Sequence, residues 1–476
     1  MMHKPIQFES LSLSYPHKTC FADFSGQILY GSRIAIIGRN DAGKSTLLKI
    51  IAGLIEPSGG DINLPKDKYF GYLPQIIDDF DSLSGGQRFN KALTQILAQG
   101  PVVLMLDEPS NHLDTNNRRS LMKMLRAFKG TLIMVTHDVE LLQSAIDTIW
   151  HIDGGNVTTF SGGYEDYLHE ISIQRGCLEQ ELAALNRQKK QIHLALMKEQ
   201  ARAKGSRMQG EKHIQQRKWP TIVATSKARH AQETSGHKKS AINDKKQGVS
   251  ERLSKLRLPE VIQPKFVLKG RENNQTLVSI SGGSVGYEKN NPILHSLTFC
   301  VKANERIAIM GNNGSGKSTL IKALLADKSF VKQGDWEVLQ LKYIGYLDQH
   351  YGTLSPDKTV LETVSLLLTN RPYVDIRKHL NDFLFRKNEE VHALISTLSG
   401  GEKARLSLAQ IAANIPNLLI LDEISNNLDL ETRNHVIQVL LAYPGAMLVI
   451  SHDADFLSAI KVSDRYYIEN GLLRRE

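Results

Sequence analysis

The sequence predicts an α/β protein built from two similar domains in tandem, joined by a long helical linker. The first observation is a repeated loop, GRNDAGKST at Gly38–Thr46 and GNNGSGKST at Gly311–Thr319. Each copy follows an apolar stretch, RIAII or RIAIM, and precedes residues typical of a helix. The second observation is that buried-strand and helix patterns alternate through both halves, as in domains with a mostly parallel sheet. A repeat of roughly 200 residues is a duplicated domain rather than a solenoid unit.

Both loops fit the phosphate-binding pattern of glycine, four residues, glycine, lysine and a hydroxyl residue. Glycines allow backbone N–H groups to turn toward a phosphate, and the helix that follows directs its positive end at the same group. The lysine would reach the β- and γ-phosphates, and the serine would bind Mg²⁺. A glycine-rich turn without a ligand is the alternative, which the duplication disfavours. The predicted phosphate-binding residues are Gly38, Arg39, Asn40, Asp41, Ala42, Gly43, Lys44, Ser45 and Thr46, and Gly311, Asn312, Asn313, Gly314, Ser315, Gly316, Lys317, Ser318 and Thr319.

Five further elements recur in the same order in both halves. A carboxylate that ends a buried strand would be costly unless it served a cation such as hydrated Mg²⁺. The glutamate after it is placed to orient or deprotonate a water, and a histidine after the next strand can sense a γ-phosphate. The pairs are Gln75 and Gln349, Leu83–Gln87 and Leu398–Glu402, Asp107 and Asp422, Glu108 and Glu423, and His137 and His452.

This paired set resembles the ATP-binding cassette family, in which two cassettes stack head to tail. In that family each ATP lies between the phosphate loop of one cassette and the LSGG motif of the other. The resemblance implies two P-loop cassette domains in tandem, with two composite sites that bind ATP and Mg²⁺ and hydrolyse ATP. Site one would join Gly38–Thr46, Gln75, Asp107, Glu108 and His137 to Ser399, Gly400, Gly401 and Glu402; site two would join Gly311–Thr319, Gln349, Asp422, Glu423 and His452 to Ser84, Gly85, Gly86 and Gln87.

The same resemblance assigns further roles to single residues. Gln75 and Gln349 would act in catalysis and also bind Mg²⁺, together with Ser45, Ser318, Asp107 and Asp422. Tyr15 and Tyr287 are similar to the aromatic residues that stack on adenine, with ordinary strand packing as the alternative.

Three positions depart from the family pattern. Asp41 stands where glycine is usual, which would place a carboxylate near the phosphates; because aspartate can adopt a left-handed conformation, we expect the loop to survive. In site two, Ile424 replaces the proline seen as Pro109, and Asn427 replaces the residue matched by His112.

The segment between the halves has a different composition. Glu165–Lys204 is rich in helix formers, and its leucines and isoleucines keep a 4-3 spacing from Leu178 to Leu196, a pattern that Val249 resumes. The pattern predicts two antiparallel, coiled-coil-like helices, with glycines from Gly205 onward punctuating a loop for which disorder is the alternative. From residue 171 to 258 there are 20 Lys and Arg against 7 Asp and Glu, whereas the whole chain nets +9. A basic middle between mildly acidic ends indicates a polyanion partner.

Two cassettes joined by a basic helical linker resemble the ABC-F class of ribosome-associated translation factors. Ser110–Asp114 (SNHLD), the GGYEDYL stretch before the linker and the short segment between Gln75 and Leu83 are similar to that class. The resemblance implies a monomer with an intramolecular cassette pair that binds the ribosome through rRNA, and also tRNA, with antibiotic protection as a narrower inference. The alternatives are the ATPase subunit of a membrane transporter, which would need a partner to reach the membrane, and a non-hydrolysing clamp. The linker tip reads Arg217-Lys218-Trp219-Pro220, an aromatic residue beside cations that is suited to stacking on an unpaired base. The alternative is that Trp219 packs on the linker helices.

The sequence also bounds the organisation and location of the chain. With 476 residues it has room for two or three domains. We expect a first cassette over 1–160, a basic helical linker over 161–270 and a second cassette over 271–476. Three scattered cysteines and the lack of an apolar leader pattern favour a reducing, cytoplasmic location.

Overall fold

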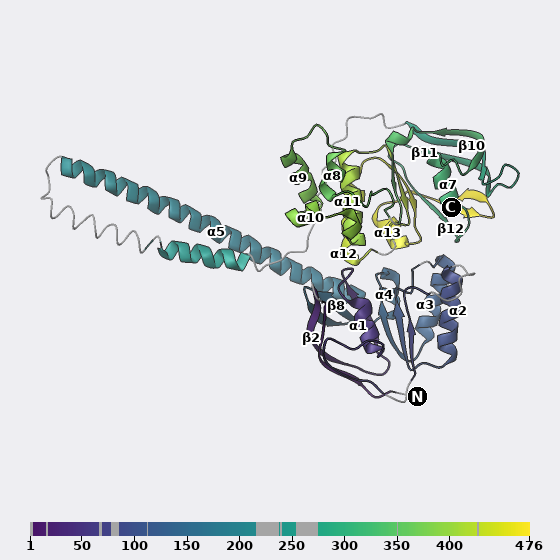
Figure 1. Cartoon of the computed structure of the whole chain (residues 1–476), viewed down its shortest axis with the longest axis horizontal. Coiled ribbons are helices and arrows are strands. Elements are labelled where there is room, and N and C mark those ends of the chain that lie inside the picture. The colour runs from purple at the N-terminus through teal and green to yellow at the C-terminus, as the bar shows by residue number, and fades with distance from the viewer. Residues whose placement is uncertain are drawn as a thin grey trace. The chain divides into compact units, whose positions relative to one another are not determined.

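The computed structural model describes residues 3–15, 18–65, 69–77, 85–111, 113–215, 238, 240–253, 275–349, 351–425 and 428–476. The chain divides into two compact units, Met1–Tyr167 with Val261–Glu476, and Leu168–Glu260. Helices and strands alternate in both halves of the first unit (Figure 1), so the predicted tandem α/β architecture with a helical linker is confirmed. The predicted domain boundaries at 160 and 270 remain a prediction.

The first half contains a six-stranded sheet and a three-stranded antiparallel sheet. The larger sheet has the order β5-β6-β7-β3-β8-β9, parallel except for β9 at its edge, and the smaller has the order β2-β1-β4. The strands are β1 Ile6–Tyr15, β2 Lys18–Ile28, β3 Arg33–Gly38, β4 Gly59–Asn63, β5 Phe70–Leu73, β6 Val103–Asp107, β7 Thr131–Val135, β8 Thr148–Asp153 and β9 Asn156–Ser161; the helices are α1 Lys44–Ile51, α2 Gly85–Ala98, α3 Thr115–Ala127 and α4 Val139–Ala145.

The second half repeats this arrangement with the orders β14-β15-β16-β12-β17-β18 and β11-β10-β13. Its strands are β10 Thr276–Gly286, β11 Leu294–Lys302, β12 Arg306–Gly311, β13 Val331–Val338, β14 Ile344–Leu347, β15 Leu418–Asp422, β16 Ala446–Ile450, β17 Asp464–Glu469 and β18 Leu472–Arg475. Its helices are α7 Lys317–Leu324, α8 Val360–Ser365, α9 Tyr373–Asp382, α10 Asn388–His392, α11 Gly400–Ala413, α12 Leu430–Ala442 and α13 Ala454–Ala459, with short 3₁₀ turns at Leu341–Tyr343 and Ile395–Thr397.

Apolar burial explains why each phosphate loop is held between two sheets. In the first half, α1 buries Leu47, Leu48 and Ile51 in one core with strands of both sheets. In the second half, α7 takes the same place, while α8, α9, α11, α12 and α13 contribute to a core on the other face of the larger sheet. The strands that carry the Asp-Glu pairs, β6 and β15, are buried along their lengths, as the continuously apolar runs predicted.

The segment after each Gln differs between the halves, as predicted. Residues 348–399, between β14 and α11, contain α8, α9 and α10, whereas only residues 74–84 separate β5 from α2. The second half therefore has helical structure at this point that the first half does not contain among its described residues.

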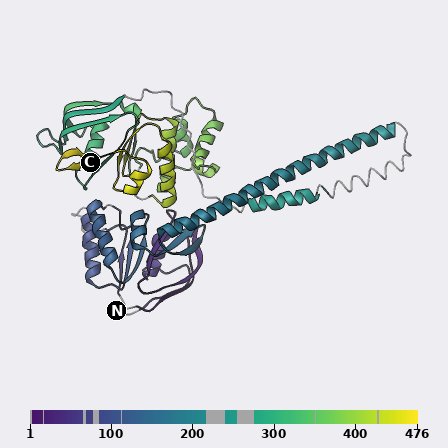
Figure 2. The same cartoon turned by 180° about the vertical axis from the view of Figure 1, so that it is seen from behind.

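The second unit consists of most of α5 (Tyr164–Gln215) and a helix over 240–253. Figures 1 and 2 both show this helix beside α5, and Leu185 and Val249, both on the predicted 4-3 pattern, are buried. The expectation that Gly205 and Gly210 interrupt the first helix is wrong, because α5 continues to Gln215. A glycine in a helix costs only about 1 kcal/mol relative to alanine, which a long helix tolerates. The predicted tip, 217–220, lies outside the described residues.

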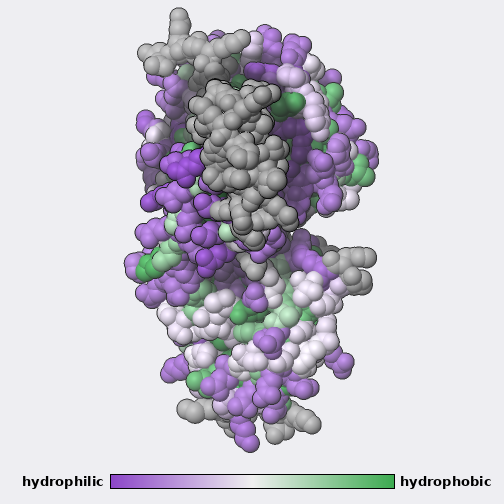
Figure 3. All heavy atoms as spheres, turned by 90° about the vertical axis from the view of Figure 1, so that its left-hand side faces the viewer, coloured by the Kyte–Doolittle hydropathy of each residue, from purple (hydrophilic) through white to green (hydrophobic). Residues whose placement is uncertain are grey.

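No helix in the described part of the chain is both long and apolar enough to cross a membrane. The face drawn in Figure 3 carries mainly hydrophilic side chains, with hydrophobic ones in smaller patches.

We expect Gly176→Ala to stabilise α5 locally. A Cβ at Gly176 would meet no other atom within 4 Å, and its backbone is helical. Alanine removes chain entropy from the unfolded state and should slow hydrogen exchange of neighbouring α5 amides about two- to fivefold, equivalent to about 0.5–1 kcal/mol. Gly43→Ala is the contrasting control, because Gly43 has φ 92° and a Cβ there would lie 2.9 Å from Cβ of Cys20. Faster or unchanged exchange around residue 176 would contradict the expectation.

Candidate active site

The first phosphate loop connects β3 to α1 and lies against β2. Gly38 has φ 148° and Gly43 has φ 92°, and a Cβ at Gly38 would lie 2.4 Å from the carbonyl oxygen of Ile152. Only glycine fits these two positions, which explains their spacing in the motif.

Lys44 places a buried ammonium at the base of this loop. The residue is 7% exposed, and its Nζ donates to the carbonyl oxygens of Gly38 and Arg39, both at 2.9 Å. Burial lowers the pKa of Lys44, while the carboxylates of Glu108 and Asp429 oppose this effect. A cation so placed favours an anionic ligand in the cavity above it.

Carboxylates stand at the ends of the strands beside each loop. Ser45 Oγ donates to Oδ1 of Asp107 at 2.9 Å, and burial raises the pKa of Asp107. In the second half, Tyr346 Oη donates to Oδ2 of Asp422 at 3.3 Å, and burial likewise raises the pKa of Asp422. Burial disfavours the charged form of these carboxylates, and a bound cation would stabilise it. Carboxylate oxygens are ligands that a hard cation such as Mg²⁺ prefers.

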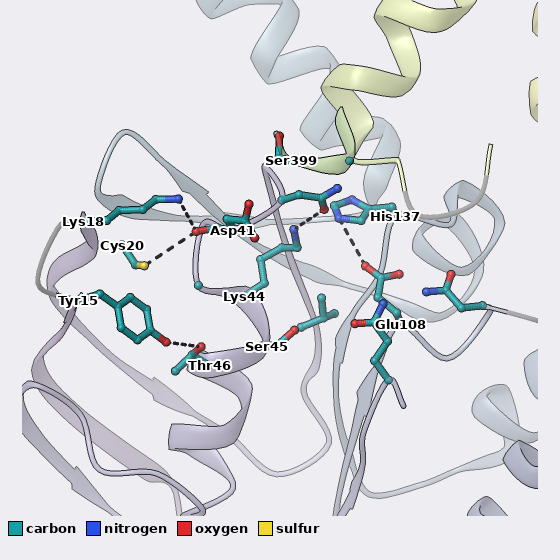
Figure 4. A pocket seen from close by; sticks show the side chains of 16 residues that line it. Tyr15, Lys18, Cys20, Asp41, Lys44, Ser45, Thr46, Glu108, His137 and Ser399 are labelled. Atoms are coloured by element: carbon teal, nitrogen blue, oxygen red, sulfur yellow. Dashed lines mark hydrogen bonds and ion pairs between the residues drawn. The ribbon is translucent and has the colours of Figure 1, made fainter. Parts of the chain in front are cut away.

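Glu108 and His137 form a buried pair that faces the cavity (Figure 4). His137 Nε2 lies 3.5 Å from Oε1 of Glu108, and neither ring nitrogen makes a hydrogen bond within the described residues. Burial raises the pKa of Glu108 to about 8 and lowers that of His137 to about 3, so the histidine is neutral. A buried histidine with unsatisfied nitrogens is ready to bind a ligand such as a phosphate oxygen.

The second half repeats this geometry. Lys317, 6% exposed, donates to the carbonyl oxygens of Gly311 and Asn312 at 2.6 and 3.1 Å. His452 Nε2 lies 4.0 Å from Glu423 Oε1, and burial lowers the pKa of His452 to about 4. Both glutamates, Glu108 and Glu423, have positive φ, 48° and 52°. Non-glycine residues pay strain for this conformation, which is typical of functional sites.

A cavity of about 570 Å³ brings most of site one together across the two halves (Figure 4). Its lining contains the predicted residues Tyr15, Asn40, Asp41, Gly43, Lys44, Ser45, Thr46, Gln75, Glu108, His137, Ser399 and Gly400. Gly38, Arg39, Ala42, Asp107, Gly401 and Glu402 are not in the lining. Glu402 instead accepts hydrogen bonds from the N–H and Oγ of Ser399, at 2.9 and 2.8 Å, in the cap of α11.

Polar contacts link the first phosphate loop to the start of α12. Asn40 N–H donates to Oδ2 of Asp429 at 3.0 Å, and Arg39 forms two bonds of 2.6 and 2.8 Å to the carboxylate of Glu431. Burial alone would raise the pKa of Asp429, but the N–H groups of Thr432 and Asn40 hold it below its usual value. Neither Asp429 nor Glu431 was predicted from the sequence. Asp429 could have been found as an aspartate at the N-cap position of a helix.

Site two is described less completely. Ser84 lies outside the described residues, and Gly85, Gly86 and Gln87 begin α2. Burial lowers the pKa of Lys317, while Glu423, Asp422 and Asp114 of the first half oppose it, so charges from both halves act there too. Ser315 belongs to the second loop, Ser318 and Thr319 to the start of α7, and Gln349 follows β14; their roles remain predictions.

The two tyrosines are exposed rather than packed into a core. Tyr15 is 51% exposed, lines the cavity, and its hydroxyl lies 3.2 Å from Oγ1 of Thr46. Tyr287 is 66% exposed and has its ring 4.9 Å from that of Phe330. Both rings are therefore accessible to a base.

Some residues of the cavity were not predicted from the sequence, and two of the departures from the family pattern lie in site two. Lys18, Cys20 and Val135 also line the cavity, and no sequence motif pointed to them; Asn111, which lines it too, belongs to the Ser110–Asp114 stretch. Of the departures in site two, Ile424 is buried, while Asn427 and its counterpart His112 lie outside the described residues.

Comparison with known proteins agrees with this geometry. The family model described as "ABC transporter" matches residues 21–77 and 294–426, once in each half. The chain is 28% identical to the ATP-binding protein Uup of Buchnera aphidicola, over 98% of this chain and 81% of that protein. It is 26% identical to the ribosome protection protein VmlR of Bacillus subtilis (99% and 88%), and 27% identical to the energy-dependent translational throttle protein EttA of Mycobacterium tuberculosis (90% and 85%).

The chain therefore carries an ATP-binding cassette domain in each half, and its relatives Uup, VmlR and EttA are ABC-F proteins. Solved structures show the same fold at lower identity. The archaeal ribosome recycling factor aABCE1, in a complex with the ribosomal stalk protein aP1, gives a TM-score of 0.62 at 18% identity, over 98% of this chain and 90% of that chain. A structure described as RNase-L Inhibitor gives 0.61 at 18% identity, with the same coverage. The two halves of the chain are thus its two cassettes.

We expect Asp41→Gly to tighten ATP binding at site one. Asp41 keeps the left-handed conformation of the glycine it replaces, with φ 65° against 78° at Gly314, and its charge raises the pKa of Lys44. Removing a carboxylate this close to the phosphates should favour binding by ~1 kcal/mol, about fivefold, because solvent screens the repulsion. Titration with a fluorescent ATP analogue measures the change. Gly314→Asp is the matched control and should weaken site two; unchanged affinity in both variants would show that this position does not act on the phosphates.

Proposed function

We propose that the chain is an ATPase that binds the ribosome in an ATP-dependent way and regulates translation or protects ribosomes. The observation that carries the proposal is a strongly basic helical pair inserted between two cassettes that retain both catalytic carboxylates. Relatives named for ribosome protection and translational control support it. The ribosome as partner would place the chain in the cytoplasm.

In each site, different residues would bind the phosphates, the adenine base and the Mg²⁺ ion. Lys44 and Lys317 would bind the phosphates, and Tyr15 and Tyr287 would stack on adenine. Ser45 and Asp107, with Gln75, would hold Mg²⁺, as would Ser318, Asp422 and Gln349 in the second site. The ion would neutralise charge on the β- and γ-phosphates.

Glu108 and Glu423 would accept the proton of the attacking water. Burial raises the pKa of Glu108 to about 8, which the nearby ammonium of Lys44 offsets only in part, so this carboxylate binds a proton more readily than an exposed one. His137 and His452, which burial keeps neutral, would donate a hydrogen bond to the γ-phosphate and so respond to its loss.

The described part of the linker presents its cations to solvent. Arg187, Lys189, Lys190, Lys198, Arg202, Lys204, Lys238, Lys245, Lys246 and Arg252 are all exposed. Each Lys or Arg that neutralises an RNA phosphate releases a counterion, which strengthens binding at low salt. A subunit that serves a membrane transporter would have no use for these charges, and the short segment before α2 leaves the first cassette little helical surface with which to grip such a partner.

Replacing both Glu108 and Glu423 by Gln should abolish hydrolysis and keep ATP binding. Loss of a general base typically costs ~10²–10⁴-fold in rate. Single-turnover ATP hydrolysis and analogue binding measure the two properties separately. Glu337→Gln, an exposed change on β13, is the control. Hydrolysis at the rate of the unmodified protein in the double variant would refute the assignment of these glutamates as general bases.

Replacing residues 207–246 by a short neutral loop should weaken ribosome binding and flatten its salt dependence. Each lost phosphate contact lowers the salt slope by somewhat less than one unit. Co-sedimentation with ribosomes at several salt concentrations, with and without ATP, measures both. A loop of the same length that keeps the lysines and arginines is the matched control and should retain most of the slope, while the ATPase activity of the free protein persists in both. An unchanged slope in the neutral variant would place the RNA contacts on the cassettes.

A further inference from the structure

Lys18 is a cation of site one to which neither the motifs nor the proposed mechanism gives a role. It is the first residue of β2, it is exposed, and it lines the cavity. Its Nζ donates to the backbone oxygen of Asp41 at 2.8 Å, so the ammonium lies against the outer side of the phosphate loop (Figure 4). A lysine ammonium stands on a flexible four-carbon stem, so it can move from a backbone oxygen to a nearby phosphate without a change in the main chain.

The carboxylate of Asp41 adds a negative charge to the first phosphate loop. Its backbone follows the left-handed turn of the loop, and its carboxylate acts on Lys44, the cation at the centre of the loop. A triphosphate bound there would meet this negative charge as well as the positive ones. Another cation near Asp41 would offset its repulsion of the triphosphate.

The second cassette serves as an internal comparison. Gly314 stands in place of Asp41, so that loop carries no such carboxylate. The two loops lie against equivalent strands, because a Cβ on Gly43 would meet Cys20 in β2 and one on Gly316 would meet Leu294 in β11. Directly before Leu294 the chain reads Asn291-Pro292-Ile293, which is uncharged. The extra anion and the cation beside it thus occur together in the first cassette.

We propose that Lys18 is a phosphate-binding residue of site one, whose ammonium contacts the triphosphate chain and offsets the charge of Asp41. The inference rests on the proposed ATP binding at this site. It makes Lys18 a residue that recognises phosphate charge, with no part in holding the base or in the hydrolytic step.

The test compares ligands of decreasing charge in the full-length protein. Site two is first disabled by Lys317→Ala, so that only site one reports. In that background, Lys18→Gln should weaken ATP about three- to tenfold at low salt, weaken ADP less, and leave adenosine unchanged, because the interaction depends on phosphate charge. Lys18→Arg should stay within about twofold of the parent, since it keeps the charge. Combining Lys18→Gln with Asp41→Gly should restore ATP affinity close to that of the parent, because one charge of each sign has been removed.

Lys129→Gln is the matched control, since it removes an exposed lysine of the same cassette away from the cavity. Unchanged ATP affinity in Lys18→Gln would overturn the inference. An equal loss for ATP and adenosine would also overturn it, because Lys18 would then shape the cavity rather than bind phosphate. A parent protein that binds no ATP would instead refute the proposed function and this assignment with it.

Discussion

The arrangement depends on a buried ammonium held at the end of a parallel strand. Lys44 and Lys317 donate to carbonyl oxygens of their own loops, and carboxylates from neighbouring strands surround them. Burying a cation is costly unless anions compensate. The strand order places β7 beside β3 and β6 beside β7, so that Glu108 and His137, which follow β6 and β7, lie near the loop that follows β3. The same order in the second cassette explains why two sites of equal design follow from one duplicated fold.

Most of each cassette could be predicted because its chemistry is local in sequence. Glycines with positive φ, a lysine and a serine at fixed spacing, and a carboxylate pair after an apolar strand all follow from backbone geometry. Lys18 and Glu431 could not be predicted in this way. Lys18 reaches Asp41, 23 residues away, because β2 packs against the loop, and Glu431 reaches the loop through contact between the cassettes, so each depends on tertiary packing. The course of α5 past Gly205 was also missed, because the cost of a single glycine is small for a long helix of otherwise strong helix formers.

The two composite sites share a plan and differ in charge. At site one, Arg39 pairs with Glu431 across the cassettes, whereas the residues at the corresponding positions of site two, Asn312 and Asn116, are neutral. Exposed ion pairs contribute only about 0–1 kcal/mol, so this contact adds little to the stability of the interface between the cassettes. Together with Asp41, it shows that sequence differences between the duplicated halves concentrate charge at one site.

The beginning of α12 carries charged residues that act on site one and on Tyr164. Asp429 caps α12 and accepts the N–H of Asn40, while Arg433, one turn later, pairs with Asp453 at 2.9 Å. Arg433 also acts electrostatically on Tyr164, the first residue of α5, whose pKa burial raises to about 12. A helix is stiff over one turn, so a displacement of Asp429 would also displace Arg433. The first turns of α12 therefore contribute both to the contacts of the first phosphate loop and to the electrostatic environment of Tyr164.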